Sequence, residues 1–284
     1  MANFRLSAFA DEADAMLDKQ LAALKRNGID RIEMRGVDGK NVSELTDDEA
    51  KLAKKKLDDA GVGFSAMGSP FGKYPIEADF TAHLNAFKRG LDICSIMGAK
   101  CIRMFSFHMP KDGSKPADWR NKVMDQLGMM LDEADKAGIK LCHENEKGIY
   151  GDTDDRCVDI MEQYGSRMGC IFDPANFIQR GVVPKTAFPK LEKYLTYMHI
   201  KDAIKETGAV VPAGMGDGSL PWILSQVNKK QGEVILTIEP HLTVFDGLAA
   251  LQDEKLEHKF SYPDKETAFD AAVTAIKGVI ASLQ

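Results

Sequence analysis

The chain has 284 residues, 44% of them hydrophobic and 28% charged, a composition typical of a protein with a buried core. Its formal net charge is −6, whereas nucleic-acid binding normally requires a basic surface, so we expect no nucleic-acid partner. It has neither an apolar run of about 18 residues nor an N-terminal signal segment, so we expect no membrane partner and a cytoplasmic location.

Short apolar runs alternate along the chain with longer amphipathic ones. Several of the short runs are rich in β-branched and aromatic residues, as strands buried on both faces are. The sequence predicts strands at 4–9, 30–35, 62–67, 101–107, 139–145, 168–174, 195–202 and 233–240.

The segments between these strands carry helix start and stop signals. Thr46 and Glu49 have the spacing of a capping box, and Gly61 stands where that helix should end. Gly28 and Gly138 are placed to end the first and fourth helices, and 264–283 is a final amphipathic helix.

Eight strand–helix units in a row favour a parallel sheet, and eight is the number that closes a (β/α)8 TIM barrel. The alternative is a doubly wound open sheet, but the sequence G-x-G-x-x-G is missing after the first strand. No linker or low-complexity tract divides the chain. We therefore predict a single α/β domain, a (β/α)8 barrel, spanning residues 1–284.

Four consecutive predicted strands end in side chains that can bind a metal ion. In chain order these are Glu144, Asp173, His199 and Glu239. The carboxyl ends of barrel strands form one face, where the active sites of this fold lie. Three carboxylates and one imidazole suit Mn²⁺ or Mg²⁺, with Co²⁺ or Zn²⁺ as alternatives. A carboxylate that only pairs with a lysine or caps a helix is the structural alternative for each residue taken singly.

These strand ends and two loops resemble those of the xylose isomerase-like TIM barrel family, the sugar phosphate isomerase/epimerase group. The similar segments are HENEKGIYGD, FDPANF, MHIKDA, TIEPH, GSPFGKYPI and VPAGMGDGSLPW. The resemblance implies one divalent ion, with Mn²⁺ as first choice, held by the four residues named above. It also implies a small sugar substrate and a homo-oligomer.

The resemblance further implies a reaction. Glu144 and Glu239 would be the catalytic acid/base pair of a metal-dependent isomerase or epimerase of a small sugar, ketose or related polyol. One carboxylate would remove a proton next to a carbonyl, and the ion would stabilise the resulting enediolate. Two departures from the epimerases put that reaction in doubt. Asn176 replaces a histidine, and Tyr150 replaces a glutamate.

Other polar residues near the strand ends are candidates for substrate binding. Side chains alternate along a strand, so a residue two positions after a candidate metal ligand lies on the same side as that ligand. This holds for Lys201, His241 and Glu146. Each candidate has a structural alternative, a salt bridge or a satisfied loop residue. The candidates are Lys201, His241, Glu146, Asn176, Arg103, Ser69 and Lys73.

Three other functions compete with the isomerase. A lyase of the same scaffold, such as an inosose-type dehydratase or a C-glycoside-cleaving enzyme, needs the same first proton abstraction. A DNA-repair enzyme of the endonuclease IV type needs a cluster of histidines for several zinc ions, but the chain has six histidines in all. The third is a non-catalytic sugar-binding barrel.

Overall fold

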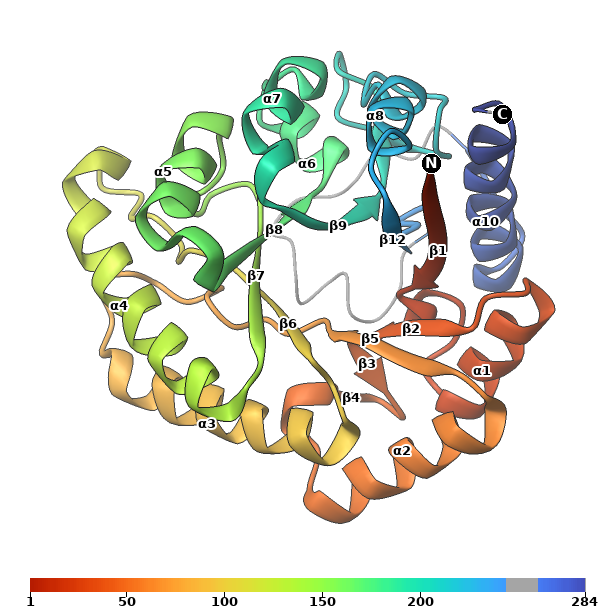
Figure 1. The fold of residues 1–284 in the computed structure, drawn as a ribbon, viewed down its shortest axis with the longest axis horizontal. Coiled ribbons are helices and arrows are strands. Elements are labelled where there is room, and N and C mark those ends of the chain that lie inside the picture. Colours follow the sequence, from red (N-terminus) through yellow and green to blue (C-terminus); the bar gives the residue numbers. More distant parts are fainter. Residues whose placement is uncertain (244–259, 284) are drawn as a thin grey trace.

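A ring of strands surrounded by helices forms the molecule (Figure 1). The computed structural model describes residues 1–243 and 260–283. Eight parallel strands form one sheet in the order β1-β12-β9-β8-β7-β6-β5-β2. The end strands, β1 and β2, contact each other and bring the ring nearly to closure. The predicted (β/α)8 barrel is confirmed.

Each predicted strand occurs within a few residues of its expected bounds. The strands are β1 (Ala2–Ala8), β2 (Arg31–Met34), β5 (Gly63–Met67), β6 (Cys101–Met104), β7 (Lys140–Glu144), β8 (Met168–Phe172), β9 (Leu195–Ile200) and β12 (Gly232–Ile238). The run predicted at 101–107 is shorter as a strand. It ends at Met104, and Phe107 has a φ of 66°, which an extended strand does not accommodate.

Helices follow the strands and cover the outside of the ring (Figure 1). They are α1 (Leu17–Arg26), α2 (Asp47–Ala60), α3 (Phe80–Met97), α4 (Pro116–Ala137), α5 (Asp154–Tyr164), α6 (Pro174–Gln179), α7 (Pro184–Leu191), α8 (Leu220–Val227) and α10 (Lys265–Ala281). A short 3₁₀ turn, η1 (Ala10–Glu12), follows β1. No helix in the described ranges is long and apolar enough to cross a membrane.

The predicted helix ends are confirmed by their local geometry. Thr46 and Glu49 form the reciprocal capping box of α2, and Gly61 ends that helix with a φ of 67°. Gly138 ends α4 in the same way. Gly28, also at positive φ, follows the last turn of α1 by two residues. These local signals set the lengths of the helices and so the positions at which the strands resume.

Two small hairpins on the same face as the strand ends were not predicted. The hairpin of β3 (Gly36–Val37) and β4 (Lys40–Asn41) follows β2, and that of β10 (Asp202–Ala203) and β11 (Val210–Val211) follows β9. Two-residue strands show no alternation in a sequence, so periodicity does not reveal them. The main apolar core fills the space between the strands and the helices, and a small cluster around Ile171 and Tyr197 lies apart from it.

Candidate metal centre and active site

The four predicted metal ligands meet at the carboxyl ends of four neighbouring strands. Glu144 is the last residue of β7, Asp173 directly follows β8, His199 lies in β9 and Glu239 directly follows β12. All four are buried. Each offers one ligand atom, and these atoms lie within 4.8 Å of one another.

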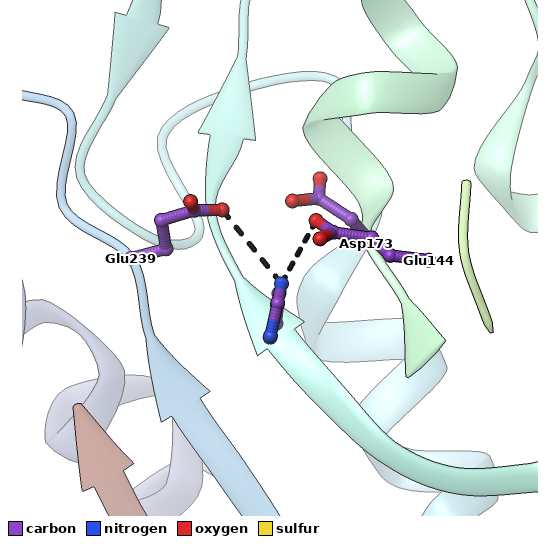
Figure 2. A group of neighbouring side chains, drawn as sticks. Glu144, Asp173 and Glu239 are labelled. Carbon is purple, nitrogen blue, oxygen red and sulfur yellow. Dashed lines mark hydrogen bonds and ion pairs between the residues drawn. The ribbon is translucent and has the colours of Figure 1, made fainter. Parts of the chain in front are cut away.

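The imidazole of His199 lies between the two glutamates. Its Nδ1 is 2.9 Å from Oε1 of Glu144 and 3.7 Å from Oε2 of Glu239. Figure 2 shows Glu239 facing Glu144 and Asp173 across the cluster. Oδ2 of Asp173 is buried, and the Lys201 ammonium lies 3.1 Å from it. Three inward carboxylates and one ring nitrogen are a donor set that fits a divalent ion.

Cationic side chains surround the same cluster. Nζ of Lys201 lies 2.9 Å from Oε2 of Glu239 and 3.1 Å from Oδ2 of Asp173. The Arg103 guanidinium lies 3.3 Å from Oε2 of Glu144. The buried carboxylates are therefore partly neutralised by the chain itself, which reduces the cost of gathering them in a low-dielectric interior.

The environment shifts the pKa values of these buried groups in different directions. Burial lowers the pKa of His199, but Glu144 and Glu33 outweigh burial and raise it to about 10. Burial raises the pKa of Asp173 to about 7, although Lys201 opposes that rise. The pKa of Glu239 is held well below its usual value, because Lys201 and its other cationic neighbours outweigh burial. A metal ion must therefore displace a proton from His199 to bind its nitrogen.

Further hydrogen bonds hold two of the four groups in place. Nε2 of His199 lies 3.1 Å from Oε2 of Glu33, and the Tyr197 hydroxyl donates to the other oxygen of Glu33 at 2.9 Å. The side chain of Asn145 donates to the backbone carbonyl of Asp173 and accepts from its amide, both at 2.9 Å. Contacts of this kind fix the orientation of metal-binding side chains.

Four of the predicted substrate-binding residues lie at this cluster. Lys201 and Arg103 contact its carboxylates, as described above. Nδ2 of Asn176 donates to Oε1 of Glu144 at 3.2 Å. Asn176, the first departure from the epimerases, therefore contacts a proposed metal ligand directly. Nε2 of His241 lies 3.3 Å from Oε1 of Glu239.

The remaining three lie around the cluster. Lys73 and Glu146 form an ion pair of 3.0 Å between the loops that follow β5 and β7. The hydroxyl of Ser69 is buried and donates to the backbone carbonyl of Arg103 at 2.5 Å. Ser69 therefore holds the loop after β5 against β6. Tyr150, the second departure, donates its hydroxyl to Asp159, a residue of α5.

The sequence reasoning missed the acidic pair that follows β1. Glu12 accepts a hydrogen bond from the backbone amide of His241 at 2.6 Å and pairs with Arg35 at 3.1 Å. Arg35 also contacts Asp11 and lies 3.2 Å from Oε1 of Glu239. Burial raises the pKa of Glu12 to about 8. The sequence did contain a signal for this pair: Asp11 and Glu12, in the segment FADE, come just after the first predicted strand.

The fold and this cluster define a class, the (β/α)8 barrels with a carboxylate–histidine centre at the carboxyl ends of their strands. The family model described as "Xylose isomerase-like TIM barrel" matches residues 21–258. The chain belongs to this family, as its motifs predicted.

Solved structures with the same fold cover nearly the whole chain. The IolI protein with a bound zinc atom is 15% identical, with a TM-score of 0.75 and 99% of each chain covered. The probable 3-DHS dehydratase AsbF from Bacillus anthracis is 12% identical, with a TM-score of 0.73 and coverage of 98% of this chain and 99% of that one. D-psicose 3-epimerase from Clostridium cellulolyticum H10, with D-tagatose, is 13% identical, with a TM-score of 0.70 and 99% coverage of each. Among curated proteins no sequence matches this chain.

Proposed function

We propose that this protein is a divalent-metal-dependent isomerase or epimerase of a small sugar, ketose or related polyol. The observation that carries the proposal is the placement of Glu144 and Glu239 on two sides of the His199 imidazole. They belong to a set of four residues whose ligand atoms lie within 4.8 Å of one another. Two carboxylates that face each other across a bound substrate can remove a proton from one face of a carbon and return it on the other.

The proposed ion is Mn²⁺, held by Glu144, Asp173, His199 and Glu239. When bound, a divalent ion supplies positive charge that stabilises negative charge developing on neighbouring substrate oxygens. Two observations support a divalent ion: one fold relative was solved with a zinc atom, and the donor atoms gathered here suit such an ion.

The residues around the proposed ion have separate roles in proton transfer, positioning and substrate binding. Glu144 and Glu239 move the proton, and Lys201 is positioned to donate a hydrogen bond to a substrate oxygen once an ion occupies its carboxylate partners. Arg103 and Asn176 hold Glu144 from two sides. Lys73 and Glu146 form the rim, with 12% and 18% of their side chains exposed, where they can contact the far end of a sugar.

Solvent exchange tests the proton transfer directly. Purified protein with Mn²⁺ is incubated with a panel of ketopentoses and ketohexoses in D₂O, and deuterium entering the carbon next to the carbonyl is followed by NMR. We expect exchange in the wild type and a loss of about 10²–10⁴-fold in Glu144→Gln or Glu239→Gln, because the amide accepts no proton. Glu133→Gln, on the outer helix α4, is the matched control. Exchange at wild-type rate in both active-site variants would refute the acid/base assignment.

A lyase is the second candidate, favoured by the amide of Asn176 on Glu144, where the epimerases have a histidine. Removal of the same proton followed by loss of a hydroxyl gives a dehydrated product. Mass spectrometry of the products separates the two, because isomers keep the substrate mass and dehydration lowers it by one water. A dehydrated product would replace the isomerase proposal and leave the metal centre in place.

A further inference from the structure

Two cysteine thiols touch inside the barrel, away from the carboxyl ends of the strands. Cys101 is the first residue of β6, Cys142 lies in the neighbouring strand β7, and their Sγ atoms are 2.9 Å apart. A disulfide bond is about 2.05 Å long, so the two sulfurs lie within about 1 Å of bonding distance. Both are free thiols in this structure.

The surroundings of this pair differ from those of Cys157 and Cys94. A Cβ atom at Gly169 of β8 would lie 2.8 Å from Sγ of Cys142, so the absence of a side chain there leaves room for that sulfur. Cys157 instead donates to the backbone carbonyl of Gly151, and Cys94 contacts the sulfur of Met67. The chain therefore contains its own comparison cysteines.

Access to the pair is one-sided. Both thiols are buried against each other, but Cys142 is fully buried as a residue, whereas Cys101, at the amino-terminal end of its strand, is partly exposed as a residue. Cys101 is therefore the nearer of the two to the surface, and we expect a small oxidant that enters from this end of the barrel to meet it first. We propose that Cys101 and Cys142 are a modification site, a dithiol that peroxide converts to a reversible intramolecular disulfide.

The chemistry of this step balances with one molecule of hydrogen peroxide. The Cys101 thiolate attacks a peroxide oxygen, the O–O bond breaks, and a sulfenic acid and hydroxide form. The Cys142 sulfur then attacks the Cys101 sulfur, the S–O bond breaks and the S–S bond forms. Together the two thiols lose two electrons and two protons, and the peroxide becomes two molecules of water. A dithiol reagent reverses the change by thiol–disulfide exchange.

The pair lies directly below the candidate metal centre. Arg103 follows Cys101 by two residues and Glu144 follows Cys142 by two, so strand alternation points all four side chains to the same inner face. Arg103 and Glu144 form the ion pair of 3.3 Å described above. Formation of the disulfide would draw β6 and β7 together just below the Arg103–Glu144 ion pair. This movement would shift Glu144 relative to the other three proposed metal ligands. This consequence rests on the proposed metal centre, whereas the disulfide itself does not.

The test is peroxide treatment of the folded, full-length protein, followed by alkylation of free thiols, trypsin digestion and mass spectrometry. Cys142 and burial raise the pKa of the Cys101 thiol, so the reaction is run at pH 9, where more thiolate is present. We expect peptides 101–103 and 141–147 to be joined, with the mass of the intact protein lower by two hydrogens. Dithiothreitol should restore it.

Cys101→Ser should abolish the linkage, and Cys170→Ser, a buried cysteine of β8, should leave it unchanged. Alkylation of both thiols after peroxide, or linkage only in denaturant, would overturn the proposal. Calorimetric Mn²⁺ titration then compares the reduced and oxidised forms, with an expected loss of about tenfold in affinity after oxidation. Equal affinity would refute the coupling. Absence of Mn²⁺ binding in the reduced protein would refute the proposed function, while the linked peptides would still decide the disulfide.

Discussion

The orientation of His199 depends on Glu33, a residue 166 positions away in the sequence. His199 can present Nδ1 to an ion only while the other ring nitrogen keeps its proton, and an acceptor at Nε2 favours that tautomer. Glu33 is that acceptor, and its own second oxygen is occupied by the Tyr197 hydroxyl. All three side chains are almost fully buried, so water does not replace a lost partner.

Substitution of Glu33 tests this arrangement through metal affinity. Glu33→Ala removes the acceptor, and we expect Mn²⁺ affinity to fall by about 10–100-fold in a calorimetric titration. Glu33→Gln keeps an acceptor oxygen, so its affinity should lie closer to that of the wild type. Wild-type affinity in the alanine variant would show that Glu33 does not position the imidazole.

At the scale of elements, a histidine connects a helix to a loop near the strand ends. Nε2 of His83, in α3, accepts the backbone N–H of Gly72 at 3.0 Å, and its ring stacks on Tyr74 at 4.8 Å between centroids. The loop that it holds also carries Ser69 and Lys73. Burial lowers the pKa of His83 to about 4. The neutral ring is the form that can accept this hydrogen bond.

This histidine makes stability depend on pH. The pKa in the unfolded chain is about 6.5, so between pH 6.5 and pH 4 the unfolded state takes up a proton that the folded state does not. The contribution is therefore complete above pH 6.5 and declines as the pH falls towards 4. We expect a loss of about 1–2 kcal/mol, because partial exposure reduces the full effect.

Urea unfolding at pH 7.5 and pH 5 measures this loss. Other groups titrate in the same range, so the comparison is with His83→Gln, which keeps a side chain able to accept from Gly72 and does not titrate. The glutamine variant should lose less stability than the wild type between the two pH values. Equal losses in the two proteins would exclude His83 as a source of acid sensitivity.

At the scale of the whole molecule, the four proposed ligands lie at the ends of four different strands, so an ion bound to them would join β7, β8, β9 and β12. The unfolded chain cannot bring these residues together, and binding to the folded state alone raises stability. The gain depends on ion concentration relative to the dissociation constant, and so does the melting temperature.

Melting curves with and without Mn²⁺ test this coupling. At an ion concentration 100 times the dissociation constant we expect about 2.7 kcal/mol and a rise in Tm of about 5 °C. Asp173→Asn should show a much smaller rise. Its side chain can still accept the amide of Asn176 that caps α6, so the helix start is preserved. The same rise in the variant would place the ion elsewhere.

The sequence alone determined the barrel and the three acids and one imidazole at its strand ends. Strand alternation, the capping box of Thr46 and the glycine stops are local features, readable over a few neighbouring residues. The order of eight such units then specifies which strand ends share a face. Glu144, Asp173, His199 and Glu239 were predictable because each lies at or directly after the carboxyl end of its own strand.

Only the tertiary structure decided which side chains become partners across the ring. Lys201 lies against Glu239 and Asp173, Glu12 against His241, and Glu33 against His199. Such contacts depend on the stagger and closure of the barrel, which periodicity does not encode. Burial acts in the same way. It is the ring, not the neighbours in sequence, that surrounds these charges and shifts their pKa values.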